Sequence, residues 1–219
     1  MSPISIASNS VNESKVYEIP KEVARGGKFY RFVKRTLDIC VSLVVGVVLL
    51  IPMLIIAVMI RCDSKGPVLF RQERIGKNGK PFMICKFRTM RVDAEKNGPQ
   101  WAEKDDDRCT KLGKKLRHYR LDELPQLWNI LKGDMTLVGP RPERQCFYDQ
   151  FEQYIHGFSN RLVVKPGLTG LAQTNGGYDL LPEEKIIYDM EYIKTRSLWL
   201  DLKLIFKTVK LVFTHEGAR

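Results

Sequence analysis

The sequence predicts an α+β fold that is mostly helical, with a small β-hairpin, a broken hydrophobic helix near the N-terminus and amphipathic helices at the C-terminus. Three observations support this class. Residues 37–60 form an apolar run that Pro52 interrupts. Alternating apolar residues flank Asn78-Gly79, the strongest short-range signal for a hairpin. Residues 111–131 and 182–214 carry apolar side chains at helical spacing.

Composition limits the classes of protein. The chain has 219 residues, of which 44% are hydrophobic and 10% aromatic, so it can bury a core and is neither disordered nor collagen-like over most of its length. Its 36 Lys and Arg against 25 Asp and Glu give a net charge of +11, which favours anionic partners. Five cysteines without a CxxC pair disfavour a disulfide framework and a zinc ribbon, and indicate a reducing, cytoplasmic setting.

The chain divides into four parts. Residues 1–24 are polar and rich in Ser and Asn, and we expect a mobile tail there. Residues 25–60 hold a basic flank and the hydrophobic helix. Residues 61–214 form one globular domain that includes the C-terminal amphipathic helix, and residues 215–219 are a short tail.

The hydrophobic run from Leu37 to Ile60 is long enough for a membrane segment. It has 24 residues and one charge, Asp38, and as a helix it would measure roughly 36 Å. A cleaved signal peptide is disfavoured, because the run begins late and lacks a small-x-small site before Arg61. The run therefore predicts a membrane-inserted helix.

Two features favour a re-entrant helix over a span. Residues 21–35 carry six bases and residues 61–91 carry nine, so both ends obey the positive-inside rule for the same side. Pro52 removes one helical donor, and its ring clashes with the carbonyl four residues earlier. Asp38 is expected at the headgroup level, where a carboxylate costs least. A kinked single span remains the alternative.

The pattern then changes to β structure and short helices. We expect strands within residues 67–76 and 80–90, and helices at 111–119 and 124–131, the second ended by Gly133. The aspartates at 105–107 would suit a metal, but a solvated loop is favoured. Two Gly- and Pro-rich segments, VGPRPE and VKPGLTGLAQTNGG, are typical of loops held around a ligand.

The C-terminal segment from Pro182 to Thr214 predicts one or two helices. Trp199 belongs to a broad apolar face, and three lysines follow at spacings of four and three residues: Lys203, Lys207 and Lys210. A basic amphipathic helix of this kind can lie in the membrane interface. Packing of a terminal helix on the domain core is the alternative.

The densest group of chemically active residues is LDELPQ, followed by GDM and GPRPE. Pro125 suits a first helical turn, which places Asp122 and Glu123 at a helix N-terminus where the dipole favours ionised carboxylates and a nearby phosphate. An aspartate can attack phosphorus when a divalent ion and a guanidinium screen the charge of the phosphate. Arg141, between two prolines, is a rigid candidate for that guanidinium. Alone, the Asp-Glu pair is weak evidence, since a solvated helix turn looks the same.

The ordered set of motifs is more specific. DSKGPVLFRQERIGKNGKPF, KFRTM, LDELPQLWNILKGDMTLVGPRPE and KPGLTGLAQTNG follow a proline-broken hydrophobic segment. From about Lys34 to Phe213 the chain resembles the bacterial polyprenyl-phosphate phosphoglycosyl transferases, the initiating sugar transferases. It resembles their minimal catalytic-core form, without the transmembrane bundle of longer relatives.

The resemblance implies a reaction and a location. The family transfers a sugar 1-phosphate from a nucleoside diphosphate sugar, usually a UDP-sugar, to undecaprenyl or another polyprenyl phosphate and releases UMP. This is the first membrane step of polysaccharide or glycoconjugate synthesis, such as capsule or exopolysaccharide. It implies a Mg²⁺ cofactor, contact with anionic lipid, and residues 61–214 as a catalytic domain on the cytoplasmic face of the bacterial inner membrane.

The resemblance also implies roles for particular residues. By the family motif, Asp122 attacks phosphorus to form a covalent phosphosugar intermediate, Glu123 helps to bind Mg²⁺, Arg141 contacts phosphate and Pro52 breaks the re-entrant helix. Three further basic positions are proposed to contact phosphate, with structural ion pairs as the alternative: Lys86, Arg88 and Arg117.

Some questions stay open at this point. The segment QTNGGYD lacks an arginine that many relatives carry there, so the sugar is undefined. A membrane adaptor or nucleic-acid-binding module would also explain the charge, but it would interleave bases with exposed aromatics. We expect no nucleic-acid partner. A transferase that moves the sugar without its phosphate would release UDP instead of UMP. A homodimer is a possible assembly.

Overall fold

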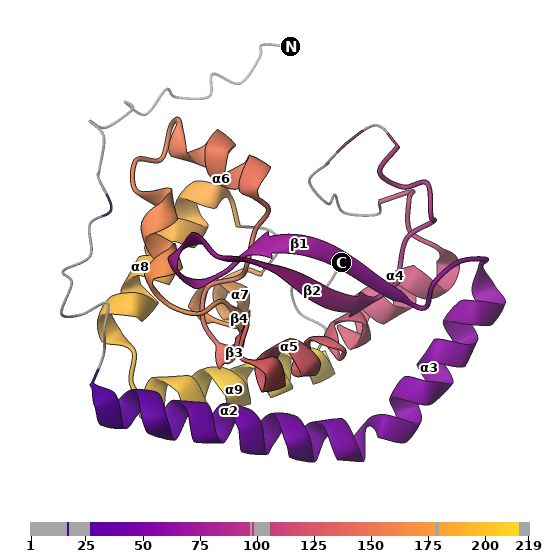
Figure 1. The fold of residues 1–219 in the computed structure, drawn as a ribbon, viewed down its shortest axis with the longest axis horizontal. Helices are drawn as coiled ribbons and strands as arrows, with labels where there is room; N and C mark the ends of the chain where they lie inside the picture. Colours follow the sequence, from indigo (N-terminus) through magenta and orange to yellow (C-terminus); the bar gives the residue numbers. More distant parts are fainter. Residues whose placement is uncertain (1–16, 18–26, 97, 99–105, 178–179, 215–219) are drawn as a thin grey trace, which may run out of the picture.

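The computed structural model describes residues 17, 27–96, 98, 106–177 and 180–214, except the side chain of residue 213. A β-hairpin crosses the middle of the molecule, two long helices run along one edge, and the remaining helices pack around the hairpin (Figure 1). The predicted tails, apart from Tyr17, and Asp105 lie outside the described residues. The fold is mostly helical with a small antiparallel sheet, as predicted.

The hydrophobic run forms two helices, α2 (Lys28–Val48) and α3 (Leu50–Asp63), which are bent by 62°. Proline at position 52 cannot donate to the carbonyl of Val48, so the regular ladder is interrupted there. The amide of Leu49 still donates to the carbonyl of Val45 at 2.9 Å. The predicted break is confirmed, and it falls just before Pro52.

Neither helix alone is long and apolar enough to cross a membrane, and no other single helix in the described ranges is. Only the bent pair of α2 and α3 passes that test of length and composition.

The carboxylate of Asp38, which was expected at the headgroup level, is enclosed by the protein itself, and its depth in a membrane stays a prediction. The side chain is buried, with 4% of its surface exposed. It accepts hydrogen bonds from Oγ1 of Thr136 at 2.7 Å and from the amide of Leu137 at 2.9 Å. Donors supplied by a distant strand therefore replace the water that the carboxylate would otherwise need, and they attach α2 to the domain.

The hairpin consists of β1 (Leu69–Ile75) and β2 (Pro81–Phe87), paired antiparallel with Leu69 opposite Phe87. The connection is a short 3₁₀ turn, Lys77–Gly79, in which Asn78 adopts a left-handed conformation (φ 58°). Asparagine and glycine tolerate positive φ, which is why this dipeptide identifies the turn from sequence. The predicted hairpin is confirmed.

A second strand pair lies in the Gly- and Pro-rich segments. Strands β3 (Thr136–Val138) and β4 (Gly167–Thr169) are parallel, and α7 (Leu171–Asn175) follows β4. The expectation of loops alone is therefore incomplete there. Three-residue strands are too short to show an alternating pattern in sequence.

The predicted central helices are present. Helix α4 (Lys111–His118) begins at Thr110, whose Oγ1 accepts from the amide of Gly113, and α5 (Gln126–Lys132) ends at Gly133 with φ 97°. Both ends use ordinary capping chemistry. The sequence did not identify α6 (Gln145–Glu152) or the 3₁₀ segment η3 (Phe158–Val163).

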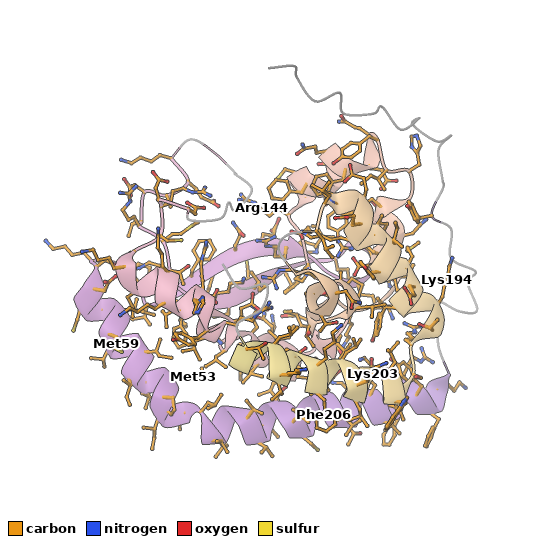
Figure 2. All side chains as sticks on the ribbon, turned by 180° about the vertical axis from the view of Figure 1, so that it is seen from behind. Met53, Met59, Arg144, Lys194, Lys203 and Phe206 are labelled. Atoms are coloured by element: carbon orange, nitrogen blue, oxygen red, sulfur yellow. The ribbon has the colours of Figure 1, made fainter. Side chains whose placement is uncertain are left out.

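The C-terminal segment forms two helices, α8 (Pro182–Thr195) and α9 (Leu198–Thr214). On α9, Asp201 and Leu204 are buried against the domain, whereas Trp199 and Phe206 are 78% and 71% exposed. One face of α9 therefore packs on the core, while another presents aromatic side chains. Helix α9 runs beside α2 along the same edge of the molecule (Figures 1 and 2).

The domain contains two hydrophobic clusters, one large and one small. The large one joins the hairpin to α5, α6 and α8. The small one lies under α3 and is formed by Ile56, Ile60, Phe87 and Leu116, with the partly buried Leu121 and Leu124 packed against it. Helix α3 thus supports the short segment that carries Asp122 and Glu123.

Candidate active site

A cavity of about 410 Å³ opens beside the hairpin. This size suits a small organic ligand. Among the residues that the structure describes, ten basic side chains and three acidic ones line it, so positive charge predominates there. The basic residues are Arg74, Lys86, Arg88, Arg91, Arg108, Arg117, Arg120, Arg141, Arg144 and Lys185, and the acidic ones are Glu95, Asp122 and Glu143.

Asp122 and Glu123 lie in a 3₁₀ turn, Leu121–Glu123, that precedes α5. Pro125 is the N-cap of α5, so both carboxylates come just before this helix, close to the predicted position. Arg120 begins the turn in a left-handed conformation (φ 55°). Such backbone strain in a non-glycine residue is concentrated at functional sites.

Glu123 is buried and held by two cations. Its Oε1 accepts from Nζ of Lys86 at 3.2 Å and from Nη2 of Arg141 at 2.5 Å. Burial alone would raise the pKa of Glu123, but the charges and hydrogen bonds of Arg141 and Lys86 lower it well below the usual range. Glu123 is therefore a carboxylate at neutral pH, and three predicted residues meet in one cluster.

Asp122 is equally buried but has the opposite electrostatics. Burial is the main cause that raises the pKa of Asp122 to about 6, and the neighbouring Glu123 carboxylate adds to it against the lowering effect of Lys86. Asp122 lines the cavity. A desolvated carboxylate facing a cationic cavity is suited to bond with an electrophile that carries negative charge.

The other predicted basic residues divide into two groups. Arg117 lines the cavity and donates through Nε to Oγ1 of Thr89 at 3.0 Å. Arg88 also lines the cavity, but its described hydrogen bonds go to the end of α3, including the carbonyl of Ser64 at 2.7 Å and that of Lys65 at 3.1 Å. Arg88 thus fixes the junction between α3 and the hairpin, and its predicted phosphate contact gains no support from these bonds.

The residues fit a Mg²⁺ ion only if a substrate supplies other ligands. Among the described residues, no group of three or more Asp, Glu, His or Cys side chains could hold a metal. Mg²⁺ commonly binds one or two carboxylates together with substrate phosphates and water. Glu123, with Asp122 beside it, meets this minimal requirement. Asp106 instead forms an ion pair with Arg108. The described residues of the segment 105–107 therefore give no support to a metal site there.

Sequence reasoning missed several residues around the cavity. Arg74 forms an ion pair with Glu143 at 3.1 Å, Arg144 pairs with Glu95 at 2.8 Å, and Arg120 lies two residues before Asp122. The position of Arg120 next to the acidic pair was a usable signal. Pairs such as Arg74 and Glu143 join distant segments and left no local pattern.

The chain is similar to known bacterial sugar transferases. Residues 29–215 match the family described as bacterial sugar transferase. The UDP-N-acetylgalactosamine-undecaprenyl-phosphate N-acetylgalactosaminephosphotransferase of Aeromonas hydrophila is 46% identical over 194 residues, which cover 87% of this chain and 46% of that protein. A UDP-glucose:undecaprenyl-phosphate glucose-1-phosphate transferase of Klebsiella pneumoniae is 46% identical over 84% of this chain and 41% of that protein.

A relative of the same name as the Klebsiella protein, from Caulobacter vibrioides, is 41% identical over 84% of this chain and 71% of that protein. The chain therefore spans less than half the length of the first two relatives and most of the third.

Proposed function

Because this chain belongs to the bacterial sugar transferase family, we propose that it transfers a sugar 1-phosphate from a UDP-sugar to undecaprenyl phosphate and releases UMP. The names of the relatives supply the acceptor and the class of donor. The differing sugars in those names leave the sugar of this chain open.

One observation carries the proposal: a buried carboxylate, Asp122, lines a cavity where ten of the described side chains are basic and three are acidic. A nucleoside diphosphate sugar has two adjacent phosphates, which such a cavity would attract. Arg141 and Lys86 pair with the carboxylate of Glu123, the neighbour of Asp122, so both would lie close to a phosphate that Asp122 attacks. Arg141 is the better phosphate partner, since its planar fork can make two parallel hydrogen bonds.

The proposed reaction has two displacements. A carboxylate oxygen of Asp122 bonds to the phosphorus that carries the sugar, and the bond from that phosphorus to the bridging oxygen breaks. The bridging oxygen leaves with the electron pair as UMP. A phosphate oxygen of undecaprenyl phosphate then attacks the same phosphorus and displaces Asp122, which regenerates the carboxylate and forms the lipid diphosphate sugar.

A Mg²⁺ ion held through Glu123 would screen the charge of the donor phosphates. Cationic side chains of the protein have the same effect, and two of them, Lys86 and Arg141, form ion pairs with Glu123. Binding of a donor would offer Arg141 and Lys86 new anionic partners and release Glu123 for the metal.

The proposed location is the cytoplasmic face of the bacterial inner membrane, with α2 and α3 as a re-entrant helix. The outer surfaces of both helices are apolar and exposed, and basic segments flank the pair on both sides.

Helix α9 would add a second contact with the membrane. Exposed Trp199 and Phe206 on α9 would lie in the interface, and exposed Lys203 and Lys210 would contact anionic lipid. A lipid acceptor could then reach the cavity without leaving the membrane. The reaction would be the first membrane step of a polysaccharide or glycoconjugate pathway.

Intact-protein mass spectrometry tests the mechanism. The enzyme is mixed in detergent with Mg²⁺ and either UDP-N-acetylgalactosamine or UDP-glucose, without lipid acceptor. We expect a mass increase of one sugar phosphate that maps to Asp122, and release of up to one UMP per active enzyme. The matched control is Asp122→Asn, which should show neither.

Other outcomes would identify the rival mechanisms. Turnover that requires undecaprenyl phosphate from the first cycle, with no adduct, would mean that the lipid phosphate attacks the donor directly. Release of UDP would mean transfer of the sugar without its phosphate. Tight binding of nucleic acid with no nucleotide release from any donor would favour a binding module over an enzyme.

A further inference from the structure

The backbone around Arg141 is held by hydrogen bonds from several parts of the chain. Every carbonyl from Val138 to Glu143 accepts a hydrogen bond, and the donors come from elements far apart in the sequence. They are Lys34 and Tyr192 to Val138, Gln173 to Gly139, the amide of Gly167 to Pro140, Arg161 to Arg141, Arg74 to Pro142 and the amide of Ile75 to Glu143.

Arg161 is the donor that acts on Arg141 itself. Its Nη2 lies 2.9 Å from the carbonyl oxygen of Arg141 and 2.6 Å from Oδ2 of Asp189. Both side chains of this ion pair are 1% exposed, and the guanidinium carbon lies 4.9 Å from the ring centre of Phe158. A single nitrogen thus joins a buried carboxylate on α8 to the backbone of the residue that binds Glu123.

Stability is a poor explanation for this pair. Moving two charges out of water costs several kcal/mol per ion, and apolar replacements of buried pairs are often neutral or stabilising. Here Nε and Nη1 of Arg161 have no hydrogen-bond acceptor among the described residues, so the guanidinium is incompletely satisfied. A buried charge held at this cost needs a purpose that an apolar side chain would not serve.

Arg141 has a matching need. Its guanidinium must lie close to Glu123 in one state and to a phosphate in another, so its backbone has to stay fixed while the side chain changes partner. Fixing the carbonyl removes the rotation of the peptide that would move the whole side chain. A misplacement of about 1 Å at a reacting centre can cost a hundredfold in rate.

We propose that Arg161 is a positioning residue for the reaction: held by Asp189, it fixes the carbonyl of Arg141 so that the guanidinium of Arg141 meets the phosphate being transferred. The inference rests on the proposed function and adds to it a residue with no access to the substrate. Arg161 is part of the core, and it acts on the chemistry only through Arg141.

The main test replaces the pair by apolar residues of similar size, Arg161→Met with Asp189→Leu, in the full-length enzyme. UMP release is measured in detergent with undecaprenyl phosphate and whichever of UDP-N-acetylgalactosamine and UDP-glucose the wild type accepts. We expect kcat to fall at least tenfold, the KM for the donor to change less than about threefold, and the Tm to stay equal or rise.

The same pair of substitutions is then made in an Arg141→Lys enzyme. Once the guanidinium is gone, its position has no further value, so we expect an additional loss in kcat of less than about threefold. Interacting residues show this non-additivity, whereas independent structural damage lowers kcat by the same factor in both backgrounds. Equal factors would overturn the inference, and so would an unchanged kcat in the wild-type background.

A second variant tests the inference if the Arg161→Met, Asp189→Leu enzyme does not fold. Arg161→Lys keeps a charge opposite Asp189, but the lysine side chain ends one bond short of the position of Nη2, so its ammonium lies farther from the carbonyl of Arg141. We expect the same loss in kcat and the same non-additivity. Glu152→Gln is the control, because Glu152 holds the amides of Gly157 and Ser159 at the start of η3 without touching Val138 to Glu143. It should lower Tm and leave kcat unchanged.

Hydrogen exchange separates this inference from the proposed function. The backbone amides of Gly139, Arg141, Glu143 and Arg144 should exchange faster in the Arg161 variants than in the wild type, whatever reaction the enzyme performs. A wild type that releases no UMP would refute the proposed function alone. Unchanged exchange at 139–144 would refute the positioning role alone.

Discussion

The fold places two adjacent carboxylates in different electrostatic surroundings. Glu123 faces Arg141 and Lys86, which hold its pKa low, whereas burial raises the pKa of Asp122. Neighbouring groups with pKa values pushed apart commonly divide two chemical roles. Here the division matches a proposed nucleophile and a proposed metal ligand, and each role predicts its own response to substitution.

Replacing the nucleophile should separate activity from stability. We expect Asp122→Asn to lower turnover by about 10³-fold or more, because the amide cannot form the bond to phosphorus. The raised pKa of Asp122 means that the folded state holds its proton more tightly than the unfolded state. As the pH rises from the unfolded-state pKa of 3.8 through the folded-state pKa of about 6, ionisation of Asp122 lowers the free energy of unfolding. Above the folded-state pKa this destabilisation is complete.

In Mg²⁺-free buffer at pH 7.5, Asp122→Asn should thus have a Tm equal to or above that of the wild type. The Tm should rise by about 2–4 °C for each kcal/mol by which the substitution increases the free energy of unfolding. Below pH 4 the difference should vanish, which thermal melts across this range can check. A Tm well below that of the wild type at pH 7.5 would show that the charged Asp122 stabilises the fold.

Glu123→Gln should behave in the opposite way. The lowered pKa of Glu123 means that its charge stabilises the fold above the unfolded pKa and that this contribution is lost on acidification through the folded pKa. The amide would remove the carboxylate charge that pairs with the partly buried Arg141 and Lys86, so we expect a lower Tm at pH 7.5. Turnover should fall severely but recover in part as Mg²⁺ is raised. A loss that is independent of Mg²⁺ would remove Glu123 from the proposed metal site.

At the scale of elements, the bend between α2 and α3 decides how the hydrophobic run can meet a membrane. Its cause is local, since Pro52 cannot donate to Val48. Its direction is fixed by tertiary contacts, because Asp38 attaches α2 to β3 while Ile56 and Ile60 attach α3 to α4 and β2. The bent pair therefore presents a single apolar outer surface.

Cysteine labelling in intact cells tests the re-entrant arrangement. Lys28→Cys and Lys77→Cys are made separately in a variant whose five native cysteines are replaced by serine. We expect neither position to react with a membrane-impermeant thiol reagent from outside, because both ends of the bent pair would be cytoplasmic, and both to react after permeabilisation. Labelling of Lys28→Cys alone would demonstrate a span.

Pro52→Ala supplies the matched comparison. Alanine restores the missing amide donor and removes the ring, which favours a straight helix by roughly 3 kcal/mol. We therefore expect Lys28→Cys to become reactive from outside in a fraction of the Pro52→Ala molecules. Continued protection would mean that the contacts of Asp38 and of α3, rather than Pro52, hold the bend.

At the scale of the whole molecule, exposed apolar side chains gather on the edge formed by α2, α3 and α9. Figure 2 labels Met59 on α3 and Phe206 on α9 along this edge, and both are exposed. Apolar surface on this scale marks an interaction site. The cavity is lined by residues of both hairpin strands and of α4, and by Asp122. An enzyme seated by this edge would lie with α2, α3 and α9 against the membrane.

Fluorescence quenching in vesicles with brominated acyl chains tests this orientation. One full-length variant keeps Trp199 alone, with Trp101 and Trp128 replaced by Phe. Another carries Tyr154→Trp as its single tryptophan, because this exposed position follows α6, far from α2 (Figure 1). We expect strong quenching at Trp199 and little at position 154. Equal quenching at both positions would contradict the proposed membrane-facing edge.

The sequence by itself determined the features with local causes. Pro52 breaks the helix by lacking a donor, Asn78 and Gly79 accept positive φ, and Thr110 and Gly133 cap their helices. The order of the motifs indicated the family, and the acidic pair with Arg141 and Lys86 was found from those motifs. The structure brings these four residues into one cluster.

Only the tertiary structure decided how those parts are held. Asn129 on α5 donates to the carbonyl of Met83 and accepts from the amide of Cys85, both on β2. Asp38 accepts from Thr136 on β3, 98 residues away, and Arg161 donates to the carbonyl of Arg141. Each of these polar groups looks like a surface residue in its own segment. A charge or an amide can be buried without a large free-energy cost only when it has hydrogen-bond partners. Here those partners come from distant segments, so the packing of the whole chain determines them and no local sequence pattern does.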